Sequence, residues 1–205
     1  MPDKSDNPPA NPQVVSFEKP AVRGETGRPR VLAIANQKGG VGKTTTAINL
    51  GTALAAIGEH VLIVDLDPQG NASTGLGIER KARRTSTYDV LTGTAPMRDA
   101  VVATAVPQLF IAPSTMDLSG LELEIGQARD RAFRLRNALA PLNAAGGTRY
   151  SYVLVDCPPS LNLLTVNAMA AANAILVPLQ CEFFALEGLS QLLQTVERAR
   201  TTRYG

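Results

Sequence analysis

Short apolar runs alternate with longer amphipathic segments along most of the chain. The apolar runs predict five strands, at residues 30–36, 60–66, 109–112, 152–157 and 174–179. Their nearly continuous Val, Leu, Ile and Ala content is typical of strands buried on both faces of a parallel sheet. Periodic apolar positions predict helices at residues 44–57, 70–77, 87–91, 118–139, 161–172 and 182–201. This alternation predicts an α/β fold, a mostly parallel sheet with helices on both faces and right-handed crossovers.

The composition agrees with one such domain and narrows the class of protein. At 205 residues, one domain is the default, and the 44% hydrophobic content with no Trp predicts an aliphatic core. A net charge of +2 is too small to require a nucleic-acid partner by itself. No apolar run approaches the ~18 residues of a membrane span, and the N-terminus lacks a signal-peptide core. We therefore expect a cytoplasmic protein without a membrane partner.

The chain divides into a tail and a domain. Residues 1–29 contain six prolines and many polar residues, so they cannot bury enough surface to fold, and we expect a disordered tail. Residues 30–205 form the predicted domain, and Gly58 is placed to end its first long helix. Cys157 and Cys181 have no metal or redox spacing, which predicts buried thiols.

The stretch between the first strand and the first helix is a candidate phosphate-binding loop. It reads Lys38, Gly39, Gly40, Val41, Gly42, Lys43, Thr44, Thr45. Glycines let backbone N–H groups turn toward an anion, and the helix N-terminus adds its dipole. Lys43 can reach the β- and γ-phosphates, and the Thr44 hydroxyl can bind Mg²⁺.

Carboxylates follow two of the other predicted strands. Asp65 and Asp67, two residues apart, end the second strand before Pro68, where open α/β sheets place ligands. Beside a phosphate loop they could hold Mg²⁺-bound water or orient an attacking water; a turn-forming helix cap is the alternative. Asp156 ends the apolar run at 152–155 and could anchor magnesium through water, opposite Thr44.

The loop departs from the usual G-x-x-x-x-G-K-[ST] pattern in a specific way. Gln37 stands where the first glycine belongs, and Lys38 follows it. The resulting K-G-G-V-G-K-T-T resembles the deviant Walker A motif of the ParA/Soj/MinD ATPases. D-x-D-P-Q-x-N at residues 65–71, D-C-P-P-S at 156–160 and P-L-Q-C-E-F-F-A-L-E-G-L at 178–189 are also similar to that family. By this resemblance the chain is identified as a member of the ParA-type chromosome- and plasmid-partitioning ATPases, which implies a P-loop NTPase with ATP and Mg²⁺ as cofactors.

The resemblance implies roles for these residues. Two subunits would enclose two ATP molecules, with Lys43 acting within its own subunit and Lys38 reaching across the dimer. Asp67 would position the attacking water. Magnesium would be held by Thr44 and, through water, by Asp156 and Asp65. The family also implies a ParB-type partner that accelerates hydrolysis, non-specific DNA bound by the dimer, and association with the nucleoid.

Family members continue beyond the point where this chain ends, so we expect the domain to lack their C-terminal strands and helices. Two functional alternatives stay open: a MinD-like or related ATPase, and a truncated nucleotide-binding protein without hydrolysis. The basic loop at residues 79–84 predicts either a solvated loop or a DNA-phosphate contact. Four arginines in the predicted helix at 118–139 favour a solvated face: Arg129, Arg131, Arg134 and Arg136.

Overall fold

The computed structural model describes residues 27–144 and 148–180, which build a single six-stranded sheet. The strands are β1 (Arg30–Ile34), β2 (Val61–Asp65), β3 (Val102–Ala103), β4 (Leu109–Ala112), β5 (Tyr152–Asp156) and β6 (Ala174–Leu176). Their order is β3-β4-β2-β5-β1-β6, and all neighbours are parallel except β3 and β4. The predicted mostly parallel α/β fold is confirmed. The count of five strands is wrong, because β3 has two residues and is too short to give a sequence pattern.

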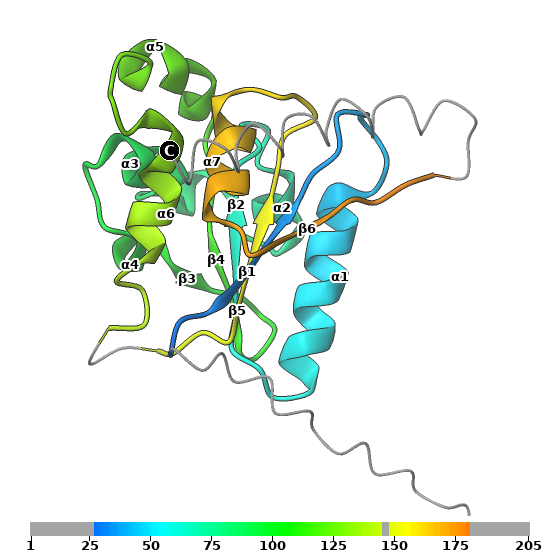
Figure 1. The fold of residues 1–205 in the computed structure, drawn as a ribbon. Coiled ribbons are helices and arrows are strands. Elements are labelled where there is room, and N and C mark those ends of the chain that lie inside the picture. The colour runs from blue at the N-terminus through cyan, green and yellow to red at the C-terminus, as the bar shows by residue number, and fades with distance from the viewer. Residues whose placement is uncertain (1–26, 145–147, 181–205) are drawn as a thin grey trace, which may run out of the picture.

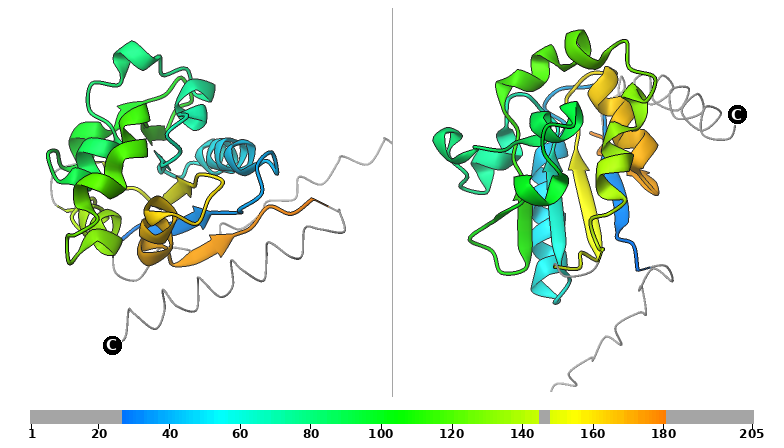
Figure 2. Two further views of the ribbon diagram at one scale, coloured as in Figure 1. Left: turned by 90° about the horizontal axis from the view of Figure 1, so that it is seen from above. Right: turned by 90° about the vertical axis from the view of Figure 1, so that its left-hand side faces the viewer.

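Helices cover both faces of this sheet, as Figures 1 and 2 show. One face carries α1 (Lys43–Ala56) and α2 (Asn71–Gly75). The other carries α3 (Thr87–Thr92), α4 (Met97–Ala100), α5 (Leu121–Ile125), α6 (Arg134–Leu139) and α7 (Leu163–Ala171). Because successive side chains of a strand point to opposite faces, each central strand contributes to both layers of the core. In β2, Leu62 and Val64 pack toward α6 and α7, whereas Val61 and Ile63 pack toward α1.

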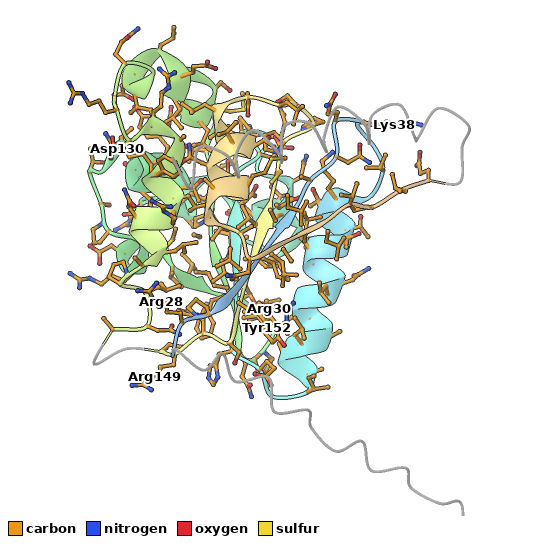
Figure 3. All side chains as sticks on the ribbon, viewed as in Figure 1. Arg28, Arg30, Lys38, Asp130, Arg149 and Tyr152 are labelled. Atoms are coloured by element: carbon orange, nitrogen blue, oxygen red, sulfur yellow. The ribbon has the colours of Figure 1, made fainter. Side chains whose placement is uncertain are left out.

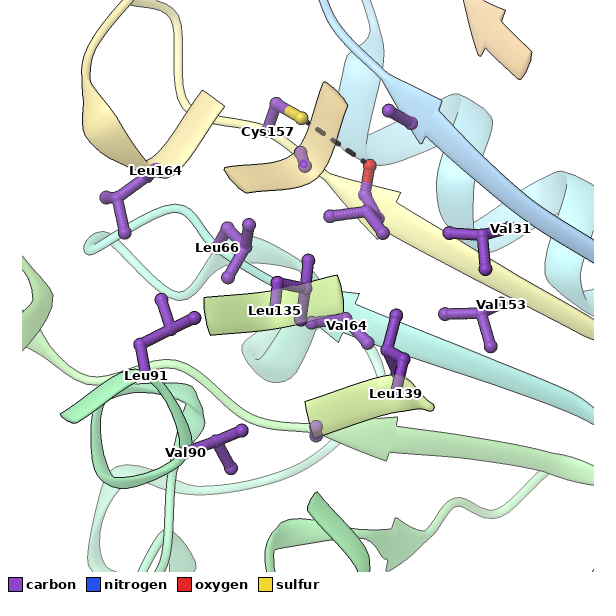
Figure 4. Packing of buried hydrophobic residues seen from close by; sticks show 14 of the residues in the cluster. Val31, Val64, Leu66, Val90, Leu91, Leu135, Leu139, Val153, Cys157 and Leu164 are labelled. Atoms are coloured by element: carbon purple, nitrogen blue, oxygen red, sulfur yellow. Dashed lines mark hydrogen bonds between the residues drawn. The ribbon is translucent and has the colours of Figure 1, made fainter. Parts of the chain in front are cut away.

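The central strands β1, β5 and β2 are parallel and paired residue for residue. At their N-terminal ends Arg30 of β1 lies beside Tyr152 of β5, and both are labelled at that end in Figure 3. The larger core layer is aliphatic and almost free of polar atoms; Figure 4 shows Val64, Val153 and Leu135 packed within it. This dry, rigid sheet fixes the positions of the residues at the opposite, C-terminal edge.

The prediction of one long helix at residues 118–139 is wrong. The segment is broken into a 3₁₀ turn at Met116–Gly120, α5, a second 3₁₀ turn at Arg131–Phe133, and α6. Gly120 precedes α5 and Gly126 follows it, and a Cβ at Gly126 would overlap the carbonyl oxygen of Glu122. The apolar positions of this segment fit one helical period only roughly because they belong to several short elements.

The smaller helices agree better with the sequence. Gly58, with φ +89°, follows the end of α1 and donates its N–H to Ala55, so the predicted C-terminal glycine is confirmed. The short helices predicted at 70–77 and 87–91 correspond to α2 and α3. The helix predicted at 182–201 and residues 1–26 of the predicted tail lie outside the described residues. In the part that is described, none of the helices combines the length and apolar character needed for a bilayer span.

The basic loop at residues 79–84 does not behave as one unit. Its 3₁₀ turn, Arg80–Ala82, is exposed, and so is Arg84. Arg83 is buried, with 7% of its surface accessible, and its guanidinium donates to the carbonyl oxygens of Ile78 and Ser114. For Arg83, both readings of the loop, a solvated side chain and a DNA contact, are therefore wrong.

Two matched leucines test this account of the core. Leu62 is fully buried in the larger layer, whereas Leu123 is 94% exposed on α5. We expect Leu62→Ala to lower the free energy of unfolding by about 2–5 kcal/mol, because it removes packed methyl groups and leaves a cavity. Leu123→Ala should change it by less than ~0.5 kcal/mol. Chemical denaturation of both variants measures the difference, and equal losses would contradict the assignment of the core.

Candidate phosphate-binding site

Three strand ends bring the candidate residues together at the C-terminal edge of the sheet. In the register of the sheet, Asp156 of β5 lies between Ile34 of β1 and Asp65 of β2. Neighbouring residues in register point to the same face, here the face covered by α1. The loop after β1, the carboxylate of β5 and the turn after β2 therefore converge beside the N-terminus of α1.

The loop between β1 and α1 has the backbone of an anion-binding turn. Gly40 and Gly42 have φ angles of +73° and +88°, a region that side chains with a Cβ rarely adopt. Gly42 also caps α1, so the unpaired N–H groups of the first helical turn face the loop. Lys43 is buried, and its Nζ donates to the carbonyl oxygen of Lys38 at 3.0 Å.

The two lysines of the loop have different surroundings. Burial lowers the pKa of Lys43, and the carboxylates of Asp156 and Asp67 act in the opposite direction by favouring the charged form. Lys38 is exposed on the loop that joins β1 to α1, at the margin of the molecule in Figure 3. Its backbone N–H donates to the side chain of Asn36 at 3.0 Å, which fixes the start of the loop.

Asp156 is the most strongly perturbed carboxyl group at this edge. It is fully buried, and neither carboxylate oxygen has a hydrogen-bond partner of good geometry. Burial raises its pKa to about 7; the nearby Thr44 hydroxyl lowers it and the negative charge of Asp65 adds to the rise. Two buried, unpartnered oxygens facing a helix N-terminus fit a hydrated cation, because a cation and its water supply the missing interactions.

Asp65, the neighbour of Asp156 in the sheet, is also fully buried but well partnered. Its Oδ2 accepts the backbone N–H and the hydroxyl of Ser73, at 2.9 and 2.7 Å, and its Oδ1 accepts the N–H of Asp67 at 3.1 Å. Burial raises its pKa to about 6, although the bonds from Ser73 and Asp67 oppose the rise. A carboxylate offers about four lone-pair sites, so these three bonds leave one acceptor site unused.

Asp67 lies just beyond β2 and faces a cavity of about 510 Å³. The cavity is lined by Gly39, Gly40, Gly42, Lys43, Thr44, Thr45, Asp67, Gln69, Asn71 and Pro159. Most of the predicted loop residues are therefore on one cavity together with Asp67. Val41, Lys38, Asp65 and Asp156 are not on its lining: the Val41 side chain packs inward and the two aspartates lie beneath the surface.

Three lining residues were not predicted as site residues: Gln69, Asn71 and Pro159. All belong to segments that resemble the family, D-x-D-P-Q-x-N and D-C-P-P-S, so the signal was present in those motifs. Over the described ranges, no group of three or more His, Cys, Asp or Glu side chains is arranged to hold a metal alone. Magnesium sites that include substrate phosphates need only one or two carboxylates, so the donors here suit that kind of site.

Comparison with known proteins places the chain in a family. Residues 29–204 match the model of an AAA domain. The chain belongs to this AAA-domain family. Its relatives include the chromosome partitioning protein ParA of Caulobacter vibrioides, 68% identical over 171 residues, and the sporulation initiation inhibitor protein Soj of Bacillus subtilis, 50% identical over 167 residues. The ParA/Soj-type resemblance drawn from the loop is thereby confirmed.

The matches cover most of this chain and less of the relatives. They include 83% and 82% of this chain, which spans 63% and 64% of the ParA and Soj sequences.

Among solved structures, cobyrinic acid a,c-diamide synthase from Mycobacterium smegmatis, with bound ATP analog and magnesium, aligns with a TM-score of 0.79 and 41% identity. That alignment covers 84% of this chain and 67% of the synthase chain. A putative plasmid partition protein from Borrelia burgdorferi bound to AMPPNP aligns with a TM-score of 0.73 and 26% identity, over 84% and 70% of the two chains.

The raised pKa of Asp156 predicts a pH-dependent stability in metal-free buffer. The folded carboxyl titrates at about 7 and the unfolded one near 4, so the folded state binds the proton more tightly. Its contribution to stability is complete below pH ~4 and is lost as the pH rises through about 7. Asn does not ionise, so Asp156→Asn removes this loss of stability at high pH. We expect the substitution to stabilise the protein by on the order of 1–3 kcal/mol at pH 8 and by less at pH 5.

Thermal melts with a chelator present, at both pH values, measure this difference. Asp117→Asn, at an exposed position, is the matched control and should change stability little at either pH. If Asp156→Asn were no more stable than the wild type at pH 8, the buried carboxylate would not carry the unfavourable charge inferred here.

Proposed function

We propose that this chain binds ATP with Mg²⁺ and hydrolyses the bond to the γ-phosphate, as the nucleotide-binding part of a ParA-like partitioning ATPase. The observation that carries this proposal is the single cavity that joins the glycine-rich loop to Asp67, with the unpartnered Asp156 behind it. A sheet edge with a helix N-terminus, a buried lysine and a cation site is suited to a polyphosphate. The names of the relatives agree with it.

The loop residues have distinct roles in this proposal. Backbone N–H groups of residues 38–45 hold the phosphates, and Lys43 neutralises their charge from within the subunit. Lys38 reaches the nucleotide of a second subunit, a role that its exposed position permits. Magnesium would be held by the Thr44 hydroxyl and, through water, by Asp156 and Asp65. When bound, the cation neutralises charge on the phosphate oxygens.

Asp67 is the residue that we assign to water activation. One of its oxygens, Oδ1, accepts the backbone N–H of Gln69 at 3.0 Å, which fixes the carboxylate. Among the described residues, the other oxygen accepts no hydrogen bond from protein, and the residue lines the cavity. A carboxylate held in this way can accept a hydrogen bond from water and orient it toward the γ-phosphate.

The relatives also support a proposal for the wider function. Two ATP-bound subunits form a dimer, the dimer binds DNA without sequence preference, and a ParB-type partner accelerates hydrolysis. ATP would then act as a switch, since a ligand shifts such an equilibrium only if it binds one state more tightly. The protein would work in the cytoplasm on the nucleoid, segregating chromosome or plasmid. No observation favours either alternative, a MinD-like ATPase or a nucleotide-binding protein without hydrolysis.

Nucleotide binding predicts a shift in thermal stability. Mg-ATP at 100 times its Kd should stabilise the protein by ~2.7 kcal/mol. For a chain of this size, this corresponds to a rise in Tm of about 5–10 °C. Lys43→Ala should abolish most of the shift, because it removes the cation buried beneath the loop. An equal shift in Lys43→Ala and wild type would place the nucleotide elsewhere.

Hydrolysis is tested by substitution of Asp67. Asp67→Ala should retain the Mg-ATP thermal shift and lose about 100-fold or more in the rate of phosphate release, because the attacking water is no longer oriented. Phosphate release is measured with DNA and a ParB-type partner present, so that a slow basal rate does not hide the difference. Wild-type activity no greater than that of Asp67→Ala would overturn the assignment of hydrolysis to this chain.

A further inference from the structure

The turn that carries Asp67 is anchored from both sides by buried groups. The N–H of Asp67 donates to Oδ1 of Asp65, and its carbonyl oxygen accepts the hydroxyl of Ser114 at 2.5 Å. The same carbonyl accepts the N–H of Gly70 at 2.8 Å. Because both peptide groups that flank Asp67 are fixed, the direction of its Cα–Cβ bond is also fixed. Ser114 contributes the one side-chain hydroxyl among these three anchors.

Ser114 comes from a different part of the sheet. It follows β4, which pairs with β2 on the side away from β5, and it is fully buried. Its own N–H donates to the hydroxyl oxygen of Ser73 at 3.0 Å, and the Ser73 hydroxyl in turn donates to Oδ2 of Asp65. The Ser73 hydroxyl accepts the N–H of Ser114 through its oxygen, so its one proton remains available for the bond to Asp65. Ser114 is therefore hydrogen-bonded directly to Asp67 and, through Ser73, to Asp65.

Arg83 holds Ser114 in this position. Its Nη1 donates to the carbonyl oxygen of Ser114 at 3.0 Å, while Nε and Nη2 donate to Ile78 at 3.1 and 2.8 Å. Nη2 also donates to the Thr74 hydroxyl at 2.8 Å. The guanidinium thus links the end of β4 to α2 and the loop after it. Gly70 allows this approach, because a Cβ there would overlap Nη1.

The composition of this cluster is unusual for a purely structural contact. Within the described ranges Arg83 forms no ion pair with a carboxylate, and its hydrogen bonds go to carbonyl and hydroxyl oxygens. Burying this cation is unfavourable, and the nearby negative charge of Asp65 offsets that cost only in part. Apolar packing could join the same elements without that cost. What the polar arrangement supplies is direction: a guanidinium fork and two hydroxyls define the orientation of each group that they bind.

We propose that Ser114, held by Arg83, is a positioning residue that sets the direction of the Asp67 side chain toward the cavity. The proposal rests on the assignment of Asp67 to water activation. Hydrolysis depends steeply on such geometry, and a displacement of about 1 Å can reduce a rate ~100-fold. Among the described residues, Ser114 and Arg83 hydrogen-bond to none of residues 38–45. We therefore expect Ser114 to affect kcat much more than the affinity for ATP.

The test compares Ser114→Ala with Ser86→Ala in the 205-residue chain. Ser86 is also a buried serine, but it caps α3 and has no bond to Asp67. We expect Ser114→Ala to lower the kcat for ATP about 10–100-fold with a Kd for ATP within twofold of wild type. Ser86→Ala should lower Tm, because a cap is lost, and leave kcat unchanged. Arg83→Lys, which keeps the charge and loses the fork, should lower kcat in the same direction as Ser114→Ala.

Amide hydrogen exchange gives a readout that does not depend on hydrolysis. Ser114→Ala should accelerate exchange at the amides of Asp67, Gln69 and Gly70, and Ser86→Ala should not. Unchanged exchange at these amides, or an equal loss of kcat in Ser86→Ala, would overturn the proposal. If the wild type binds ATP without hydrolysing it, the proposed function fails, and the exchange measurement alone then decides whether Ser114 fixes the turn.

Discussion

Two buried carboxylates side by side at one edge of a parallel sheet are the constraint on which the site depends. Asp65 and Asp156 are neighbours in register and both are fully buried. Burial raises the pKa of each, and the negative charge of Asp65 further raises the pKa of Asp156. Like charges in a dry environment disfavour ionisation of both groups. The surrounding groups lessen this penalty: the buried ammonium of Lys43, the N-terminal dipole of α1 and the guanidinium of Arg83.

The two carboxylates are stabilised in different ways, and this difference separates their functions. Asp65 accepts three hydrogen bonds from Ser73 and Asp67, so most of its capacity is used to shape the turn after β2. Asp156 accepts none of good geometry. The first group is therefore mainly an organiser of the loop that carries Asp67, and the second is the one whose requirements a ligand must satisfy. Both were predicted from sequence as magnesium ligands of similar standing.

The sequence predicted the parts of the molecule whose signal is local. A strand, a glycine-rich loop and a helix are contiguous, so the positions of Gly42, Lys43 and Thr44 could be anticipated. The aspartates could be anticipated too, because parallel strands bring their C-terminal ends to one edge. Arg83 could not, since a basic run looks the same whether its members are solvated or whether one of them turns inward to meet a serine 31 residues away. The helix prediction for residues 118–139 failed for a related reason, because the apolar positions of several short packed elements together gave an approximate helical period.

The unsatisfied state of Asp156 also indicates how stability and function are related in this domain. A fold selected for stability alone would place an apolar residue or a hydrogen-bonded one at the centre of its sheet. This sheet instead keeps a charge that is unfavourable until a cation and its water arrive, next to a lysine whose charge burial disfavours. A ligand that carries both a cation and phosphates would satisfy Asp156 and Lys43 together. Binding would then remove the electrostatic penalty of burying these two charges, so stability and ligand binding are thermodynamically linked.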